Sequence, residues 1–336
     1  TGTDKARSGA RTYLALLLVT SVGLMLPAMV AIWMLTGTLA FTPEGIMAGR
    51  VDPALGALLL VVLAYGIGKA ALMPFHRWLP AAMVAPTPVS ALLHAVAVVK
   101  AGVFSMLTVA LFIFGLDYLR GLATQPLMLY IAVFTMLAAS LVALHQDNLK
   151  ARLAYSTVSQ LAYIVTGALL ATELSALGGG LHMLMHGFGK ITLFFCAGAI
   201  YVASGINTVS GMNGLARRMP LTMLAFFIGA LCVIGLPPTG GFWSKWYLVN
   251  GAWLAEHYVI VAAFVLSTLL NIAYLLPPVM RAFLKPLPEG DSAAPVRIQE
   301  APALCLIPLL VTAAGTLVLF VLADPALQML KMGMSS

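Results

Sequence analysis

The chain contains few charged residues. Only 9% of its 336 residues are Asp, Glu, Lys or Arg, whereas about 25% is usual in soluble domains. The longest polar stretch, at about 281–300, is too short to form a soluble domain. Together with a hydrophobic content of 61%, this composition excludes an ordinary soluble enzyme and predicts an integral membrane protein.

Cysteine is also scarce, and the pattern of a metal or redox centre is absent. The three cysteines stand apart in apolar runs and form no C-x-x-C pair, so neither a disulfide framework nor a cysteine metal site is indicated. We also find no ligand pattern for haem, flavin or an iron–sulfur cluster. The sequence therefore predicts no cofactor, no metal and no catalytic site of its own.

The apolar runs are continuous rather than alternating, and several reach the roughly 20 residues that a spanning helix needs. This pattern predicts an all-α polytopic membrane protein with about nine transmembrane helices. We expect them at 12–35, 53–72, 88–114, 125–145, 152–171, 176–203, 220–249, 258–281 and 302–323.

Charge is distributed unevenly over these spans. All eleven acidic residues fall in loops or at span edges, whereas four of the eighteen basic residues fall inside spans. Of the other fourteen, eleven lie on the side of the N-terminus, and only Arg50, Arg120 and Lys331 lie opposite. By the positive-inside rule the N-terminal side faces the cytoplasm, so the excess positive charge orients the chain and argues against a nucleic-acid partner. The expected location is the bacterial inner membrane.

The stretch GGLHMLMHGFGKITLFF places His182, His186 and Lys190 on one stripe of a helix, because they are spaced by four residues. Charge at bilayer depth is costly, so ionisable residues there usually mark an ion pathway. Histidine titrates near neutral pH, and a water-bridged row of such groups can pass protons along. The alternative is that each side chain only holds helices together through hydrogen bonds.

The stretch GLPPTGGFWSKWYL predicts a broken helix. Pro237-Pro238 and Gly240-Gly241 stand in the middle of a span and do not favour a continuous helix. Such a break is tolerated only where the freed backbone is buried in protein or lines a watery cavity, as at the ion sites of transporters. Lys245 follows the break. The alternative for Lys245 is snorkelling to an interface, which the neighbouring tryptophans would fit.

The stretch 66–102 carries three more ionisable residues inside predicted spans. Lys69 is flanked by glycine near a span end, and the segment FHRWL after it is predicted to lie at the surface. His94 and Lys100 follow in the next span. Their spacing of six puts them about 240° apart on an ideal helix, so we expect them to face different neighbours. A structural role remains the alternative for each of the three.

Four blocks carry a family resemblance. PFHRWLPAAMVAPTPVSALLHAVAVVKAG resembles the signature of the antiporter-like subunits shared by respiratory complex I, membrane-bound hydrogenases and Mrp-type cation/proton antiporters. DNLKARLAYSTVSQLAY, HMLMHGFGKITLFF and GLPPTGGFWSKWYL are similar to three further blocks of that family, in the same order. The tail NIAYLLPPVMRAFLKP most resembles Mrp D-type and complex I subunit 5-like proteins.

The resemblance implies two inverted five-helix repeats, each with a broken helix. Residues 1–123 would be the remainder of the first repeat, 124–281 the second, and 282–336 a polar loop with a C-terminal transmembrane helix. The family's first repeat also carries a glutamate that pairs with the lysine of the broken helix, here Lys69, and that glutamate would precede this chain. We therefore expect either a separate polypeptide to supply it or the chain to be part of a longer protein.

The resemblance also implies a function. Lys69, Lys100, Lys190 and Lys245 would change protonation, with His94, His182 and His186 beside them on a proton path along the central membrane plane. The predicted protein is a proton-translocating subunit of a multisubunit complex, with other membrane subunits as partners and protons, or also sodium, as cargo. It would be an enzyme only as part of an NADH:quinone oxidoreductase-type complex. The alternatives are an independent solute or ion transporter and a purely structural membrane subunit.

Overall fold

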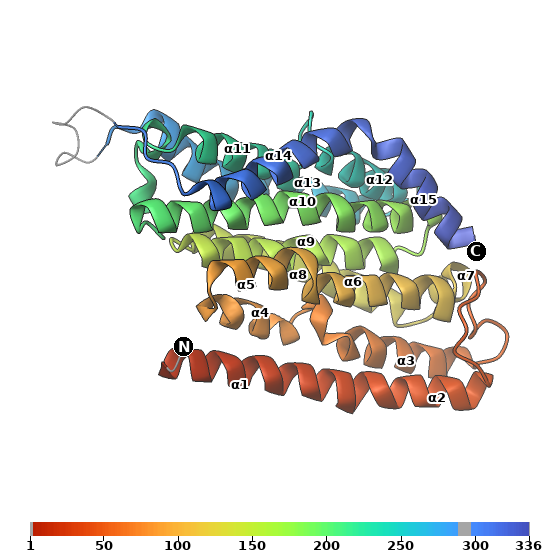
Figure 1. Ribbon diagram of the computed structural model, residues 1–336. Coiled ribbons are helices and arrows are strands. Elements are labelled where there is room, and N and C mark those ends of the chain that lie inside the picture. Colours follow the sequence, from red (N-terminus) through yellow and green to blue (C-terminus); the bar gives the residue numbers. More distant parts are fainter. Residues whose placement is uncertain (1–2, 288–296, 336) are drawn as a thin grey trace.

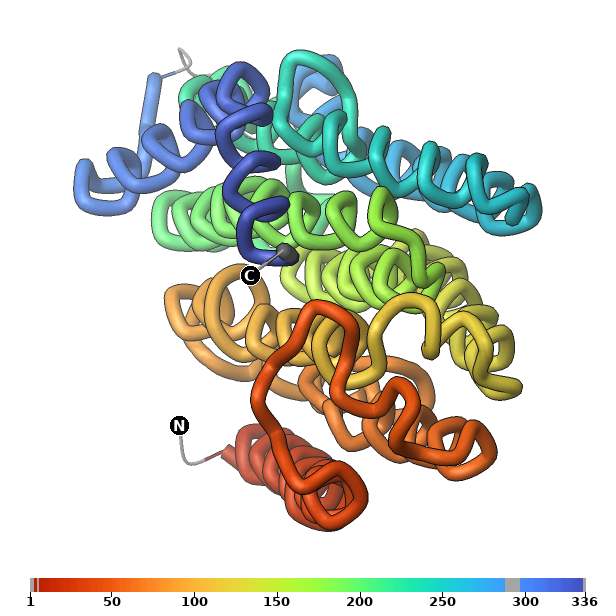
Figure 2. Tube along the Cα trace, turned by 90° about the vertical axis from the view of Figure 1, so that its right-hand side faces the viewer, coloured from red at the N-terminus to blue at the C-terminus, as the bar shows by residue number. Residues whose placement is uncertain are grey.

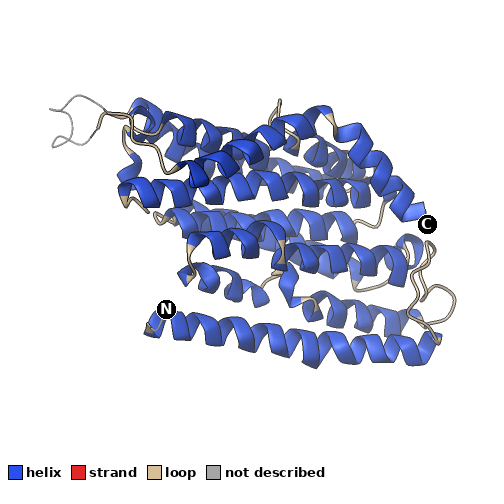
Figure 3. Cartoon of the chain, in the orientation of Figure 1, coloured by secondary structure: helices blue, strands red, loops and turns tan. Residues whose placement is uncertain are grey.

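The computed structural model describes residues 3–287 and 297–335. Figure 3 shows that these residues form helices joined by loops, and they contain no strand beyond one isolated bridge between Asn148 and Thr208. The α-helices are α1 Asp4–Leu18, α2 Leu26–Thr36, α3 Pro53–Gly66, α4 Trp78–Ala81, α5 Thr87–Ala91, α6 Val98–Thr108, α7 Leu116–Arg120, α8 Gln125–His145, α9 Leu149–Leu169, α10 Glu173–Ser204, α11 Pro220–Ile234, α12 Gly241–Leu254, α13 Tyr258–Leu284, α14 Ala303–Val321 and α15 Ala323–Ser335.

The described helices can be grouped into nine units, of which six are long and apolar enough to cross a membrane, and this confirms the predicted all-α polytopic fold. Six units satisfy the length and hydropathy of a membrane span, at Ala6–Thr36, Thr87–Phe114, Gln125–His145, Glu173–Ser204, Tyr258–Leu284 and Ala303–Val321. The seventh is α9, which has 21 residues but a more polar sequence. The last two are broken units, α3 with α4 and α11 with α12. The first and second spans of the six contain π-helical turns that join their α-helical parts.

The helices lie broadly in chain order across the molecule, although α13 packs against α8 and α14 packs against α10. Figures 1 and 2 show the rod of α1 and α2 along one edge, α9 and α10 in the middle, and α14 with α15 at the other edge. The edge rod exposes large apolar side chains such as Leu18, Val22 and Met34, as a lipid-facing helix would. In contrast, α9 is buried almost throughout, although it carries Arg, Ser, Thr and Gln. Polar side chains are thus concentrated where they are shielded from lipid.

The break in the second broken unit has a local cause. Helix α11 ends at Ile234, and Gly235 adopts a left-handed conformation with φ of 90°. Pro238 has no N–H group, so it cannot donate to the Ile234 carbonyl four residues earlier. Helix α12 then starts at Gly241. The chain therefore leaves a free backbone acceptor inside the bundle, as the proline and glycine pairs predict.

The first broken unit is interrupted between Gly66 and Trp78. The indole nitrogen of Trp78 donates to the Gly68 carbonyl at 3.0 Å, and both Trp78 and Leu79 are fully buried. The prediction that FHRWL lies at the surface is therefore wrong for its last two residues. The physical reason is that the broken backbone beside Lys69 needs a buried donor, which the tryptophan supplies.

Loops distant in sequence meet at one end of the bundle. Val209 N donates to the Asp147 carbonyl at 2.8 Å, and Gly214 N donates to the Arg281 carbonyl at 3.1 Å. Ser210 donates to the Asp147 carboxylate through its hydroxyl and its N–H, and these bonds lower the pKa of that carboxyl. The loops after α8, α10 and α13 therefore share one membrane face, as the sorting of basic residues requires.

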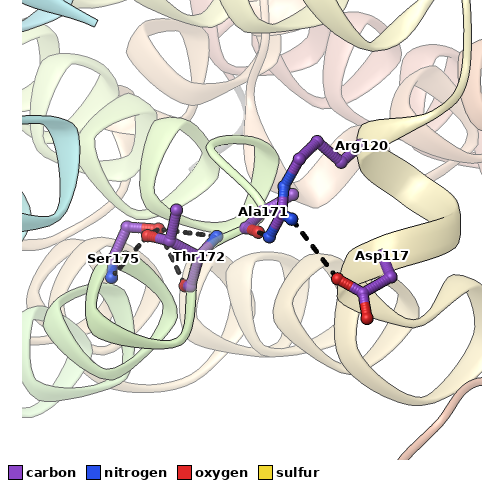
Figure 4. A network of polar contacts seen from close by, with 5 residues as sticks. All are labelled: Asp117, Arg120, Ala171, Thr172 and Ser175. Carbon is purple, nitrogen blue, oxygen red and sulfur yellow. Dashed lines mark hydrogen bonds and ion pairs between the residues drawn. The ribbon is translucent and has the colours of Figure 1, made fainter. Parts of the chain in front are cut away.

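At the opposite end of the bundle, contacts around Ala171 and a capping box set where α10 starts. Figure 4 shows Arg120 at the end of α7, where it donates to the Ala171 carbonyl at 2.7 Å and lies 3.3 Å from the Asp117 carboxylate. The next residues form a capping box in which Thr172 and Ser175 satisfy each other's backbone N–H groups. Since α10 is one uninterrupted helix from here, this cap sets where its polar stripe lies.

Arg152 ties three helices together. Although buried, its guanidinium donates to the carbonyls of Gln146 at 2.7 Å, Leu144 at 3.3 Å and Tyr274 at 3.0 Å. The Tyr274 carbonyl is available because its usual donor in α13 would be Pro278, which has no N–H. Arg152 thus satisfies the proline break in α13 and the end of α8 from the first turn of α9.

Replacing Arg152 with alanine should lower the free energy of unfolding by about 3 kcal/mol, because three buried carbonyls lose a charged donor. The change can be measured as a loss of thermal stability of the purified protein. The matched control is Arg50→Ala, since the exposed Arg50 donates one bond, to the Thr36 carbonyl at 3.2 Å. Equal stability of the two variants would contradict this role of Arg152.

Candidate functional site

The polar stripe of α10 lies at the centre of the bundle. His182, His186 and Lys190 are all buried with almost no exposed surface. The imidazole rings of His182 and His186 lie 5.8 Å apart between centroids and are nearly parallel. The prediction that the three residues share one face of a helix agrees with their contacts, which lie on α6, α9 and α12.

His186 meets Lys100. The Nζ atom of Lys100 on α6 lies 2.7 Å from Nδ1 of His186, which is hydrogen-bond distance. The Nε2 atom of His186 has no hydrogen-bond partner among the described residues. The pair thus joins the first half of the chain to α10 and leaves one buried imidazole nitrogen available.

His182 is held from two sides. Its Nε2 atom lies 3.1 Å from Oε1 of Gln160 on α9, and its Nδ1 atom lies 2.9 Å from the hydroxyl of Ser244 on α12. Its ring also stacks on Tyr163 at 5.5 Å. Either ring nitrogen can carry the proton, because Gln160 and Ser244 can each donate or accept.

Lys245 faces inward beside the break in its own unit. Its side chain is 6% exposed, and Nζ donates to the Ile234 carbonyl at 2.9 Å, the acceptor that Pro238 leaves free. The same ammonium lies 4.5 Å from the centre of the Tyr163 ring. Snorkelling to an interface is therefore excluded for Lys245.

Lys190 reaches α9 and, through it, α13. Its Nζ atom donates to the Ser156 hydroxyl at 2.6 Å and to the Leu153 carbonyl at 3.2 Å. The Ser156 hydroxyl lies 2.9 Å from the hydroxyl of Tyr274, which in turn bonds to the side-chain amide of Asn271. Because that amide also reaches Lys245, a continuous set of contacts joins the two lysines.

Four residues of this set were not anticipated from the sequence, namely Ser156, Gln160, Asn271 and Tyr274. A signal for them was present, because Arg152, Ser156 and Gln160 repeat every four residues in an otherwise apolar segment. Such spacing places them on one face of α9. The partners on α13, Asn271 and Tyr274, are three residues apart, which also places them on one face of their helix.

His94 and Lys69 are less connected. His94 is fully buried against the ring of Phe194 on α10 at 5.3 Å, and neither of its ring nitrogens has a partner among the described residues. Lys69 is partly buried, and within residues 3–287 and 297–335 its amine has no hydrogen bond or ion pair. The structure joins five of the seven predicted site residues into one set, by direct contact or through the polar side chains of α9 and α13, and leaves these two beside them.

His94 and Lys100 both face α10, at Phe194 and His186 respectively. The two neighbouring side chains differ, as expected, but both of these neighbours lie on α10. The ideal-helix angle does not apply here, because residues 92–96 form a π-helical turn and Ala97 is irregular, with φ of −100° and ψ of −76°. The extra residue in that turn rotates Lys100 towards the same neighbour.

Carboxylates stay away from this cluster. Among the residues that the structure describes, no Asp or Glu is buried, and the two ion pairs are exposed ones between residues three apart. Glu289 and Asp291 lie outside the described residues. The same described part of the chain holds no group of three or more His, Cys, Asp or Glu suited to a metal ion. The buried site is thus a set of amines and imidazoles joined by neutral polar side chains. The amines and imidazoles are the groups that can exchange protons.

Comparison with known families gives one match. The family described as NADH:quinone oxidoreductase/Mrp antiporter, transmembrane, matches residues 1–271, which include every predicted site residue. This match confirms the resemblance carried by the four sequence blocks.

Individual relatives of known sequence agree with this family match. The chain is 36% identical over 301 residues to NADH-quinone oxidoreductase subunit N of Desulforudis audaxviator, covering 86% of this chain and 59% of the relative. It is 36% identical over 223 residues to NAD(P)H-quinone oxidoreductase chain 5 of Synechocystis sp., covering 62% and 31%. The chain therefore spans less than two thirds of either relative.

Among solved structures, the Mrp complex from Dietzia sp. DQ12-45-1b contains a chain with the same fold. The TM-score is 0.84 at 23% sequence identity, covering 97% of this chain and 67% of that one. At this identity the similarity supports the fold.

Proposed function

This chain belongs to the NADH:quinone oxidoreductase/Mrp antiporter family of membrane proteins, and on that premise we propose that it is a proton-translocating membrane subunit of a multisubunit complex. It is a multi-pass membrane protein. Its relatives are subunits of quinone oxidoreductases, and the solved structure of the same fold is part of an Mrp complex. The proposed partners are therefore other membrane subunits, and the proposed cargo is the proton, alone or in exchange for sodium.

One observation carries the proposal, namely the buried row of basic groups that are linked by direct contact or through neutral polar side chains. Lys100 contacts His186, the His186 ring stacks on His182, and Lys245 and Lys190 contact the same set of polar side chains. Burying such groups without carboxylates is unfavourable unless protonation can change. A row of exchangeable bases explains why the fold keeps them there.

Water would complete the row. The buried ring nitrogens of His94 and the Nε2 atom of His186 have no protein partner among the described residues, and buried polar atoms of this kind are usually satisfied by ordered water. We place bridging water at these nitrogens. Such water would connect His94 to the central row.

The division of the chain follows the same proposal. Residues 1–123 would be the remainder of a first inverted repeat that contains Lys69, and 124–281 would be the second repeat that contains Lys245. Residues 282–336 would form the polar loop and the last transmembrane helix. Within residues 3–287 and 297–335 no Asp or Glu is buried near Lys69, which fits a counter-charge contributed from outside this chain.

The proposed orientation places the N-terminal side in the cytoplasm of a bacterium, with the chain in the inner membrane. This rests on the excess of Lys and Arg at the face where the loops after α8, α10 and α13 meet. Labelling an introduced cysteine in the 207–214 loop with a membrane-impermeant reagent tests the orientation.

A direct test compares inside-out membrane vesicles from cells with and without this chain. Proton uptake, followed with a pH-sensitive dye, should disappear without the chain and return when it is restored. The purified chain alone in liposomes should translocate no protons, because the counter-charges and drive come from partners. Transport by the chain alone would favour the independent transporter. Full activity of variants lacking the buried lysines would favour a structural subunit.

A further inference from the structure

Asn271 lies where the contacts of Lys190 and Lys245 meet. It is fully buried on α13, and only one orientation of its planar amide satisfies all of its neighbours. After a half-turn, the amide nitrogen faces groups that donate and the amide oxygen faces a carbonyl, so that orientation requires its neighbours to change. In the first orientation, the amide oxygen accepts from Lys245 Nζ at 2.9 Å and from Gln160 Nε2 at 3.0 Å. The amide nitrogen then donates to the Ser267 carbonyl at 3.2 Å and to the Tyr274 hydroxyl. This orientation suits a charged Lys245.

The second orientation reverses these bonds. The amide oxygen accepts from the Tyr274 hydroxyl, and the amide nitrogen points at Lys245 and Gln160. An ammonium group has no lone pair and cannot accept, whereas a neutral amine can. The amide oxygen also faces the Ser267 carbonyl in this orientation, which is unfavourable. The second orientation therefore becomes populated only when Lys245 has lost its proton.

Gln160 must follow Asn271. In the first orientation its nitrogen donates to Asn271, so its oxygen, 3.1 Å away, accepts from Nε2–H of His182. In the second, Gln160 turns and donates to Nε2 of His182. The imidazole proton then sits on Nδ1 and is donated to the Ser244 hydroxyl at 2.9 Å, which donates onward to the Gly241 carbonyl at 3.0 Å. Both tautomers of His182 thus find a complete set of partners.

The bonds towards Lys190 reverse as well. In the first orientation Tyr274 donates to the Ser156 hydroxyl, whose own hydrogen is then free to be donated to a neutral Lys190. In the second, Tyr274 donates to Asn271 and accepts from Ser156, so Lys190 can only donate. The charge on Lys245 and the bonding required of Lys190 are therefore linked.

We infer that Asn271 and Gln160 form an amide switch that couples the charge of Lys245 to the tautomer of His182 and to the direction of the hydrogen bonds at Lys190. Both amides are positioning residues, since they turn but carry no proton. The proton that leaves Lys245 is one of the protons that the chain translocates. The inference rests on the proposed function, because only a translocation cycle would discharge Lys245 repeatedly.

The switch predicts a change in His182 that can be observed by nitrogen NMR of the complete protein, labelled with ¹⁵N-histidine and kept in its purified complex. As pH rises through the titration of Lys245, His182 should convert from the Nε2–H to the Nδ1–H tautomer. The other titratable groups facing this pair are Tyr163 on α9, His186 and Lys190 on α10, Cys232 on α11, Tyr274 on α13 and Lys100 on α6. Lys245→Met leaves all of them in place and should abolish the conversion.

Asn271→Leu should also abolish the conversion, because the link to Gln160 is cut. An ionised Asp side chain can only accept hydrogen bonds, so Asn271→Asp should hold His182 as the Nε2–H tautomer at every pH. This variant replaces the leucine variant if the latter fails to assemble. The control is Asn250→Leu, since the amide of Asn250 bonds only to the Trp246 carbonyl of its own helix. It should convert like the unmodified protein.

Conversion that persists in Asn271→Leu or Lys245→Met would overturn the switch, and so would the absence of any conversion in the unmodified protein. The proposed function is tested separately by proton translocation in a Lys190→Met variant. Loss of translocation together with a His182 tautomer independent of Asn271 would refute the switch alone. Persistent translocation in the Lys190 variant would instead refute the proposed function.

Discussion

Replacing Lys190 with methionine is expected to lower proton translocation by the assembled complex about a hundredfold or more, the scale on which a positioned proton-transfer group usually acts. Lys190 is fully buried, and its amine is the titratable group that contacts Ser156 and the Leu153 carbonyl. Methionine keeps an unbranched apolar stem of similar length but can neither bind nor release a proton. Dye quenching in inside-out vesicles, normalised to the amount of complex, measures the effect.

The matched control is Lys285→Met, because Lys285 is exposed just after α13. That variant should translocate like the unmodified protein. If Lys190→Met also retained normal translocation in an intact complex, the chain would have a structural role and the row of bases would not conduct.

Replacing Lys245 with methionine is expected to lower translocation about tenfold or more, because it removes the base beside the break in the α11–α12 unit. The Ile234 carbonyl, free because of Pro238, would also lose its donor. An unsatisfied buried carbonyl costs about 1–3 kcal/mol, so thermal stability should fall slightly. The vesicle assay and a thermal unfolding curve together separate the loss of a proton carrier from a loss of structure.

Lys331→Met is the control for this second variant, since Lys331 is exposed on α15. Both its translocation and its stability should match the unmodified protein. A Lys245→Met variant that is destabilised but translocates normally would show that Lys245 only closes the broken helix.

Much of the site was open to prediction because it depends on local geometry. Residues spaced by four on an uninterrupted helix share a face whatever surrounds them, so His182, His186 and Lys190 were predictable as one stripe. The break before Lys245 was predictable for the same reason, since proline lacks an N–H wherever it stands.

Other parts of the site depend on contacts between distant segments. The partners Asn271 and Tyr274 lie more than one hundred residues from Ser156 in sequence, and only the packing of α13 against α9 brings them together. The facing of Lys100 depends on a π-helical turn that its apolar sequence does not announce. The position of Trp78 was mispredicted because its buried partner is a backbone carbonyl, which any residue could have supplied.

The sequence by itself determined that this protein lives in the membrane as a helical bundle, that its interior bases are lysines and histidines, and where its helices break. Hydropathy, spacing and the chemistry of proline act locally and need no knowledge of neighbours. The tertiary structure alone decided which base meets which: that Lys100 joins His186, that Lys69 stays apart, and that the amides of Gln160 and Asn271 link His182 with both Lys190 and Lys245. Hydrogen bonds act over about 3 Å, so such pairs exist only once the helices have packed.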